Sequence, residues 1–339
     1  MYKRATLVTV LAISAIAIGS LAGCAASTST STPAATAGGS VHGKKVSFLT
    51  VTQTCAYCAA QAAAFQAKLK SAGVDVTTVT TNFDAAEQAQ QVNQAISTRP
   101  DAIVIWPADA SAIVPSLEKI KQAGIKVVIS TSIPSTSNTS LWAAFTGPNN
   151  VSLGEASARS LVAGLKEKGL GLSGDILEIT GTAGAASTIG RTDGFKAELA
   201  REAPGLKIVG SQPGNWDQTI ATTATAALFS QFGGDKVIGI YGEADNMVAG
   251  IITAADRAGY KPGKNLVVVG SDCTIDGYNN IKNGSQYASN LQDPAKDGQN
   301  VASATLAVLE GKPVPNIAYM KTPAITAANV ELCAAADGK

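Results

Sequence analysis

Short apolar runs alternate with amphipathic helical patterns along most of this chain, and this alternation constrains the fold more than any other feature. The runs lack the apolar–polar alternation of a half-exposed strand, which is typical of strands buried in a parallel sheet. Several helical patterns end at a glycine, such as Gly73, Gly124 and Gly259. The order predicts an α/β protein. The expected strands cover 46–51, 102–106, 126–129, 175–179, 237–241 and 266–269, and the expected helices cover 59–72, 85–96, 112–123, 151–168, 220–232 and 249–258.

The part of the chain with this pattern is long enough for two domains. About 300 residues follow the amino-terminal segment, more than a single hydrophobic core usually serves, and the whole chain is 45% hydrophobic. Right-handed crossovers place helices on both faces of a parallel sheet, and ligands bind outside the carboxyl ends of its strands. We therefore predict two doubly wound domains, with functional residues in the loops that follow the strands.

The amino-terminal segment is predicted to be an export signal. Lys3 and Arg4 precede an apolar stretch over 5–18, which Leu21-Ala22-Gly23-Cys24 follows. The pattern resembles a lipoprotein signal, and the resemblance implies removal of 1–23, a lipid on Cys24 and anchoring to the outside of the cell membrane. A transmembrane anchor is the alternative, but the apolar stretch is short for a bilayer that needs about 20 residues. Residues 24–43 are rich in Ser, Thr and Ala, which predicts a flexible tether.

Charge and histidine content exclude several classes of function. Without Lys3 and Arg4 the net charge is about −1, so nothing recommends a nucleic acid partner. The only histidine, His42, lies in the tether, which removes Ser-His-Asp and Cys-His catalysis and disfavours a zinc site at the cysteines. We predict no metal, no cofactor and no enzymatic activity.

Six loop segments resemble, in their order along the chain, the ribose-type sugar-binding proteins of ABC importers. Each segment alone is a weak signal, but six in register from about Lys45 to Met320 are a strong one. The resemblance implies a type I periplasmic-binding-protein fold, in which two lobes joined by three hinge crossovers close on a sugar. It implies one lobe from 44–147 and 293–320, and another from 148–292 and 321–339. The six segments are 53–58, 106–109, 211–217, 242–247, 270–272 and 290–294.

The resemblance also implies a ligand site between the lobes. Tyr57 matches an aromatic residue of the first loop and Trp216 matches one of the second domain, so their rings are expected to stack on the C–H face of a sugar. Asp272, after the strand at 266–269, and Gln292, in a hinge, are expected to bind hydroxyl groups. The predicted site is completed by Cys55, Trp106, Thr131 and Asp245.

Some of these residues have structural alternatives. Trp216 would otherwise be a core or lid aromatic, and Asp272 would otherwise cap a helix that begins near Thr274. Trp106 is either a second aromatic wall or a plug at the end of its strand. The sequence leaves these alternatives open.

The chain departs from the family pattern where the family has charged residues. The family's ligand-binding arginine falls on Ile189, and Arg191 takes a neighbouring arginine position that is usually structural. The family's Asp-Arg pair falls on Thr131 and Ser132, and an asparagine falls on Ala244. The smaller set of charged groups indicates an uncharged ligand and leaves the identity of the sugar or polyol open.

Four cysteines remain after Cys24, an even number that is typical of disulfides in an exported protein. Cys55 and Cys58 are close enough to bridge locally, which would leave Cys273 with Cys333 if all four pair. The three possible connectivities stay open. The Cys-x-x-Cys spacing also raises an alternative function, an exported thiol-disulfide oxidoreductase that uses Cys55 and Cys58.

The resemblance implies two partners and a role. The predicted protein is a monomer that captures a sugar or polyol outside the cytoplasm and presents it to an ABC transporter permease. Ligand binding is expected to favour the closed arrangement of the lobes. Binding of a small molecule other than a sugar by the same fold is a further alternative.

Overall fold

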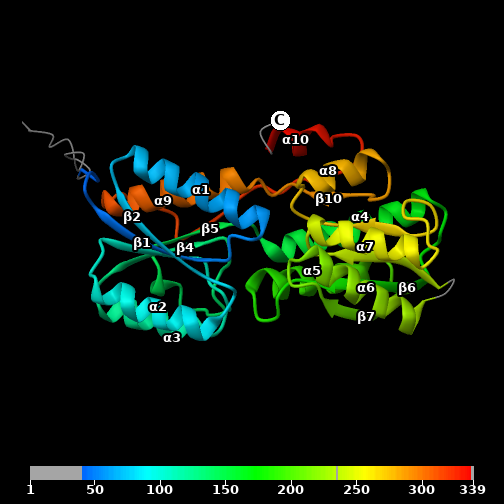
Figure 1. Cartoon of the computed structure of the whole chain (residues 1–339), viewed down its shortest axis with the longest axis horizontal. Helices are drawn as coiled ribbons and strands as arrows, with labels where there is room; N and C mark the ends of the chain where they lie inside the picture. Colours follow the sequence, from blue (N-terminus) through cyan, green and yellow to red (C-terminus); the bar gives the residue numbers. More distant parts are fainter. Residues whose placement is uncertain (1–39, 234–235, 337–339) are drawn as a thin grey trace, which may run out of the picture. The chain divides into compact units, whose positions relative to one another are not determined.

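Two parallel β-sheets, each covered by helices on both faces, organise the residues that this computed structural model describes, 40–233 and 236–336 (Figure 1). The predicted fold class is therefore confirmed. The predicted export signal, Cys24 and most of the predicted tether lie outside the described residues. In the described part, no helix combines the length and the apolar character that crossing a bilayer requires.

The first lobe contains a sheet with the strand order β11-β5-β4-β3-β1-β2, in which all neighbouring strands are parallel. Its elements are β1 (Lys45–Val51), α1 (Ala56–Ser71), β2 (Asp75–Thr81), α2 (Ala85–Ser97), β3 (Ala102–Ile105), α3 (Val114–Gln122), β4 (Lys126–Ser130), the 3-10 helix η1 (Thr139–Leu141), β5 (Ala144–Gly147), α9 (Pro294–Leu309) and β11 (Ile317–Tyr319). Phe48 of β1 packs against Phe65 of α1, whereas its neighbour Leu49 clusters with Val92 of α2 and Leu117 of α3. Helices α1 and α9 therefore cover one face of the sheet, and α2 and α3 cover the other.

The second lobe is built in the same way around a parallel sheet with the order β7-β6-β8-β9. Its elements are α4 (Asn150–Glu167), β6 (Gly174–Thr180), α5 (Ala186–Glu202), β7 (Leu206–Pro213), α6 (Gln218–Phe232), β8 (Val237–Gly242), α7 (Asp245–Arg257), β9 (Val267–Val269), α8 (Ile275–Lys282), the antiparallel pair β10 (Ser289–Asn290) and β12 (Ala324–Ile325), and α10 (Glu331–Ala336). Ile176 of β6 faces α4 and α5, and Leu177 faces α6 and α7.

The described chain passes between the lobes three times. It leaves the first sheet after β5 and enters α4 through 148–149, returns from β10 to α9 through 291–293, and leaves again from β11 to β12 through 320–323. The first two of these segments carry Pro148 and Gln292, which line the cavity described below. The connections between the lobes therefore form part of the site.

A close crossing of α4 and α5 in the second lobe depends on two glycines. A Cβ atom at Gly154 would overlap the carbonyl oxygen of Arg191, and one at Gly194 would overlap the carbonyl oxygen of Val151. The helices can approach this closely because neither glycine carries a side chain. The crossing holds Nε of Arg191 3.2 Å from Oδ1 of Asn150, the first residue of α4.

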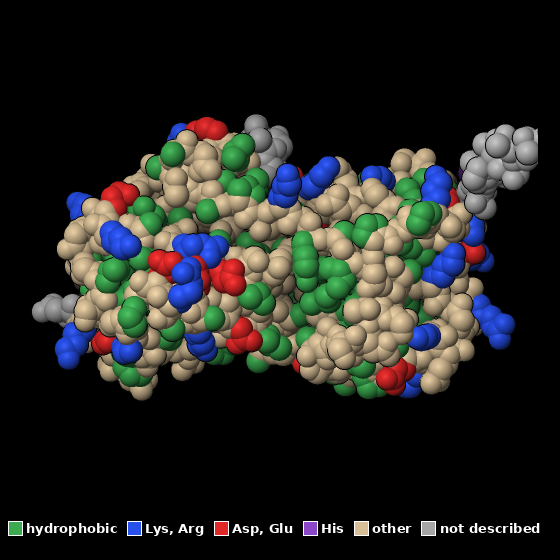
Figure 2. Space-filling model, turned by 180° about the vertical axis from the view of Figure 1, so that it is seen from behind, with side chains coloured by type: hydrophobic (Ala, Val, Ile, Leu, Met, Phe, Trp, Pro, Cys, Tyr) green, Lys and Arg blue, Asp and Glu red, His purple; other side chains and the backbone are tan. Residues whose placement is uncertain are grey.

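Surface charge of both signs is spread over the described residues. On the face shown in Figure 2, Lys and Arg side chains lie among Asp and Glu side chains. That face therefore offers no continuous basic stripe for a polyanion.

Candidate functional site

A cavity of about 100 Å³ lies between the two lobes and takes its walls from both. Its loops follow the carboxyl ends of β1, β3, β4, β8 and β9, where ligands bind in parallel α/β sheets. Room for one water takes only about 10–15 Å³, so the space suits a small molecule. The first lobe contributes Cys55, Ala56, Tyr57, Cys58, Phe83, Trp106 and Thr131, and the second lobe contributes Ser187, Arg191, Trp216, Ala244, Asn246, Asp272, Thr274, Ile275 and Asp276.

Seven of the eight residues expected at the ligand site line this cavity. They belong to six different segments of the chain, so their convergence depends on the topology of both sheets. Their contact with a ligand stays a prediction. The seven are Cys55, Tyr57, Trp106, Thr131, Trp216, Asp272 and Gln292.

Asp245 is the expected site residue that the structure places elsewhere, and this corrects its assignment as a ligand contact. Its fully buried carboxylate accepts hydrogen bonds from the Cys273 N–H, the Ser289 hydroxyl and the Gln286 amide, each at 2.7 Å. A Cβ atom at Gly270 would overlap the same carboxylate, so the surrounding space is already filled. Asp245 therefore braces the loop that carries Asp272.

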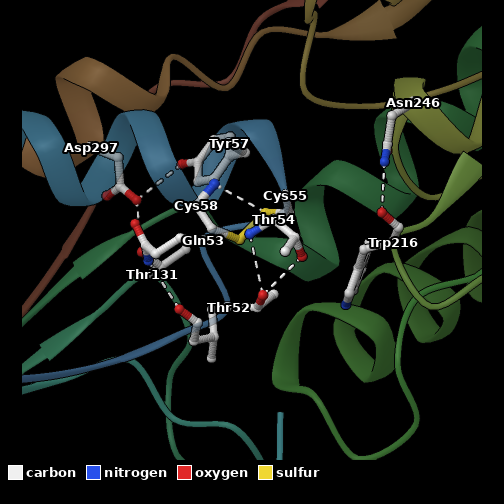
Figure 3. Close-up of a disulfide and its surroundings, with 11 residues drawn as sticks. Thr52, Gln53, Thr54, Cys55, Tyr57, Cys58, Thr131, Trp216, Asn246 and Asp297 are labelled. Atoms are coloured by element: carbon white, nitrogen blue, oxygen red, sulfur yellow. Dashed lines mark hydrogen bonds between the residues drawn. A yellow bond between two sulfur atoms is a disulfide. The ribbon is translucent and has the colours of Figure 1, made fainter. Parts of the chain in front are cut away.

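The wall from the first lobe is largely apolar and includes a disulfide (Figure 3). Cys55 is bonded to Cys58, and its sulfur accepts a hydrogen bond from the Cys58 N–H at the start of α1. The Tyr57 and Trp106 rings meet edge to face, with centroids 6.1 Å apart, and Phe83 packs beside them. Trp106 therefore both closes the end of its strand and forms a second aromatic wall, so the two alternatives for this residue coexist.

Trp216 provides the aromatic side chain of the opposite wall. The Asn246 amide donates to the Trp216 carbonyl oxygen at 2.7 Å, and Asp217 caps α6 immediately after it (Figure 3). A Cβ atom at Gly181 would overlap the indole ring, so the glycine leaves room for Trp216 beside β6. The ring is half-buried at the cavity rather than enclosed in the core.

Four cavity residues have left-handed backbone conformations that non-glycine residues rarely adopt. The φ angles are 56° at Phe83, 61° at Thr131, 62° at Trp216 and 92° at Asp272. Such conformations cost free energy and persist where the surrounding structure enforces them, which is common at binding sites. The strain in both lobes supports a functional role for this cavity.

Arg191 lies in the cavity wall and contacts Gln292, in the second passage between the lobes. Its guanidinium donates to Gln292 Oε1 at 2.8 Å and to the Glu243 carbonyl oxygen, and it lies 3.1 Å from Asp272 Oδ1. It also lies 5.7 Å from the centre of the Trp216 ring, within the range of a cation–π contact. The family pattern makes the position of Arg191 usually structural, so Arg191 was not among the expected ligand contacts, but it lines the cavity. The available signal was its place on the buried stripe of α5 with Phe195.

Several polar atoms around the cavity are buried without a hydrogen-bond partner in the described part of the chain. They are Trp216 Nε1, Asp272 Oδ1 and Thr274 Oγ1. The Asp272 oxygen is close enough to Arg191 for an ion pair but lies outside hydrogen-bond geometry. Buried polar groups are rarely left unsatisfied, so these atoms indicate a ligand that carries both donors and acceptors.

The second disulfide adjoins the opposite wall. Cys273, which follows Asp272, is bonded to Cys333 of α10 and is almost fully buried. Each disulfide thus lies next to a cavity residue, one in each lobe. Over 40–233 and 236–336, no three His, Cys, Asp or Glu side chains are grouped in a way that could hold a metal ion.

The lobes also touch at the edge of the cavity. The Ala110 N–H, from the loop after β3, donates to the Gly184 carbonyl oxygen at 3.0 Å. A Cβ atom at Gly184, whose φ is 84°, would overlap the Asp109 carboxylate of the other lobe. The contact therefore requires a glycine at 184 and helps to enclose the space between the lobes.

In the second lobe, one hydroxyl group contacts two buried carboxyl groups, and this arrangement makes stability depend on pH. Thr192 Oγ1 lies 3.0 Å from Glu243 Oε1 and 3.1 Å from Glu178 Oε1, and a hydroxyl has only one proton to donate. One contact therefore requires a protonated carboxyl. Burial raises the pKa of Glu243 to about 8 and also raises the pKa of Glu178.

We expect the free energy of unfolding to fall as pH rises toward 8, and Glu243→Gln to reduce this fall. The pKa of Glu243 is higher in the folded protein than in the unfolded chain, where it is about 4.3. The resulting stabilisation is therefore fully present below about pH 4.3 and is lost as pH rises through about 8. The substituted amide would stay neutral at all pH values. Burial also raises the pKa of Asp245 and of Asp297, so part of the decrease in stability with pH would remain in the variant. Urea unfolding across this range measures the effect, with exposed Glu118→Gln as control. Equal slopes in wild type and Glu243→Gln would contradict the shared proton.

Comparison with known proteins agrees with this arrangement. A family model described as a periplasmic binding protein domain matches residues 46–313. The fructose import binding protein of Bifidobacterium longum is 30% identical, with 80% of this chain and 78% of that protein covered. The xylitol-binding protein of Mycolicibacterium smegmatis is 26% identical, with 78% and 72% covered.

Solved structures share the fold. A galactofuranose-binding protein superposes with a TM-score of 0.78 at 24% identity, covering 86% of this chain and 97% of that one. An ABC transporter solute-binding protein from Mycobacterium smegmatis, with bound glycerol, gives a TM-score of 0.76 at 26% identity, with 86% and 96% covered. With the family model spanning most of the chain and two doubly wound lobes around one cavity, this chain belongs to the periplasmic binding protein family.

Proposed function

We propose that the protein captures an uncharged sugar or polyol in the cavity between its lobes and delivers it to an ABC importer. One observation carries the proposal: aromatic rings from both lobes frame a cavity whose buried polar atoms lack partners. Aromatic faces suit the C–H face of a sugar, and unpaired donors and acceptors suit its hydroxyl groups. Relatives named for binding xylitol, fructose and ribose support the same ligand class.

An uncharged ligand fits the balance of charge at the cavity. The positive charge of Arg191 is already compensated by Asp272, at an N–O distance of 3.1 Å. A carboxylate or phosphate ligand would compete with Asp272 for that guanidinium and leave a buried aspartate unpaired, which is costly. A hydroxyl-rich ligand adds hydrogen bonds without disturbing the pair.

The role proposed for the whole protein is transport rather than catalysis. The lobes close on the solute, and the closed form is recognised by a permease. We further propose a monomer that acts outside the cytoplasm, held to the membrane by a lipid on Cys24, with the lobe boundaries given above. The family assignment favours this role over the oxidoreductase alternative for Cys55 and Cys58.

Trp216→Ala is expected to weaken binding at least about tenfold, or about 1.4 kcal/mol. The substitution removes a stacking face and an unpaired indole N–H from the cavity. Calorimetry against a panel of xylitol, ribose, fructose, allose, arabinose, galactose, myo-inositol and glycerol identifies the ligand and measures the change. Tyr319→Ala, which removes an exposed aromatic residue of β11, is the control. If no panel member binds, or if Trp216→Ala binds as tightly as wild type, the proposal fails.

A further inference from the structure

A buried carboxylate, that of Asp297, lies behind the wall from the first lobe. Asp297, in the first turn of α9, is fully buried. Its Oδ2 accepts hydrogen bonds from the Thr131 hydroxyl at 2.7 Å and from the Tyr57 hydroxyl at 3.0 Å (Figure 3). Asp297 itself does not line the cavity, whereas both of its partners do.

The side chains of Gln61, Ser130, Thr131 and Asp297 form a chain of hydrogen bonds in which each group donates toward Asp297. The Gln61 amide donates to Ser130 Oγ at 2.9 Å, and Ser130 Oγ lies 3.0 Å from Thr131 Oγ1. Burial raises the pKa of Asp297 to about 7. Above that pH the ionised carboxylate can only accept, so the Thr131 proton is directed to Asp297 and the Ser130 proton to Thr131. Because these four side chains are all buried, the chain polarises each hydroxyl toward the carboxylate.

The Tyr57 hydroxyl is held in the same way. Burial and the Asp297 carboxylate raise the pKa of Tyr57, so the phenol stays protonated and can donate to Asp297. The Gln292 side chain acts in the opposite sense on this pKa as a hydrogen-bond partner of the same phenol. Gln292 and Tyr57 both line the cavity.

We propose that Asp297 is a positioning residue that turns the protons of Tyr57 and Thr131 away from the cavity, so that this wall accepts hydrogen bonds from ligand hydroxyls. The inference rests on the proposed function and refines its ligand class. The ligand presents O–H donors to the first lobe, and a ring oxygen, carbonyl or ether at that position is disfavoured. In the second lobe, the Trp216 N–H is buried without a partner and serves an acceptor of the ligand.

The test is run above the raised pKa of Asp297, which is about 7. It uses the tightest ligand of the sugar and polyol panel together with its monofluoro derivatives. Fluorine replaces a hydroxyl with a group that cannot donate. For the hydroxyl that faces Tyr57 and Thr131, the fluoro derivative is expected to bind wild type at least about tenfold more weakly than the parent. In Asp297→Asn the new amide donates to the two oxygens, which frees their protons to face the cavity. The preference for the parent should then fall below about threefold.

Two further variants separate this effect from a general loss of structure. Asp293→Asn removes the same charge from the same helix and keeps its N-cap, so the wild-type preference should remain. Thr131→Val keeps the shape of the wall and removes one acceptor, so it should lose part of the preference even if Asp297→Asn folds poorly. An unchanged preference in Asp297→Asn or in Thr131→Val would overturn the inference.

A measurement without ligand distinguishes failure of the inference from failure of the proposed function. The Cζ resonance of isotope-labelled Tyr57, assigned with Tyr57→Phe, is expected to move in Asp297→Asn and to stay in place in Asp293→Asn. A resonance that does not move in Asp297→Asn would overturn the inference. If no panel member binds, the proposed function is contradicted. This resonance alone then decides whether Asp297 accepts a hydrogen bond from the Tyr57 hydroxyl.

Discussion

Arg191→Met is expected to abolish measurable ligand binding, a loss of at least about a hundredfold, and to destabilise the protein. The substitution leaves the buried Asp272 carboxylate without its cationic partner. It also leaves the Gln292 amide oxygen and the Glu243 carbonyl oxygen without their hydrogen-bond donor. Removing one partner of a buried ion pair typically costs about 3–5 kcal/mol. Calorimetry with the panel ligand and urea unfolding measure the two effects.

Two variants make this prediction specific. Arg201→Met removes an arginine from the exposed side of the same helix, where it pairs with Glu198 and Glu202, and should leave affinity unchanged. Arg191→Lys keeps the charge but loses the planar fork, so we expect a folded protein with clearly weaker binding. Tight binding by Arg191→Met would show that the guanidinium does not organise the site.

Removal of the Cys273–Cys333 disulfide by paired alanine substitutions is expected to lower the free energy of unfolding by about 4 kcal/mol. The bridge joins residues 60 positions apart, so it restricts a large part of the unfolded chain. Because Cys273 follows Asp272 directly, we also expect weaker ligand binding. Urea unfolding under non-reducing conditions gives the change in stability.

The other disulfide provides a matched comparison. Cys55 and Cys58 are three positions apart, and the same chain-entropy model gives less than about 2 kcal/mol for their bridge. Cys55→Ala with Cys58→Ala should therefore cost much less stability while it changes the wall beside Tyr57. Equal losses for the two pairs would contradict the chain-entropy explanation.

Strands that are continuous apolar runs could be predicted from the sequence. The exposed strands could not, and neither could β5, which is buried but short and includes Thr146 and Gly147. β3 and β8 are buried along their whole length and appear as continuous apolar runs. The edge strands β2 and β7 consist mostly of exposed and half-exposed residues, many of them polar, so they lack that signal. Helix α5 was not predicted because Gly190 and Gly194 lower its helix propensity, although Gly194 serves its close packing on α4.

The site was predictable where its residues follow strands. Tyr57, in the first turn of α1, and Trp216 and Asp272, in loops, belong to segments whose order along the chain carries a recognisable pattern, and all three line one cavity. Asp297 lies in the first turn of a helix, where an acidic residue is commonplace and stabilises the helix dipole. The signal that could have found it is its place on the buried stripe of α9 with Val301 and Thr305, where an aspartate needs a buried partner.

The hydrogen bonds of Arg191 reach two of the passages that join the lobes or their immediate neighbours. One cation contacts Asn150, just after the first passage between the lobes, and Gln292, within the second passage. A solute that contacts this guanidinium or its partners would therefore affect hydrogen bonds at two passages between the lobes at once. In the proposed function, recognition of the solute and coupling between the two passages would thus involve the same side chain.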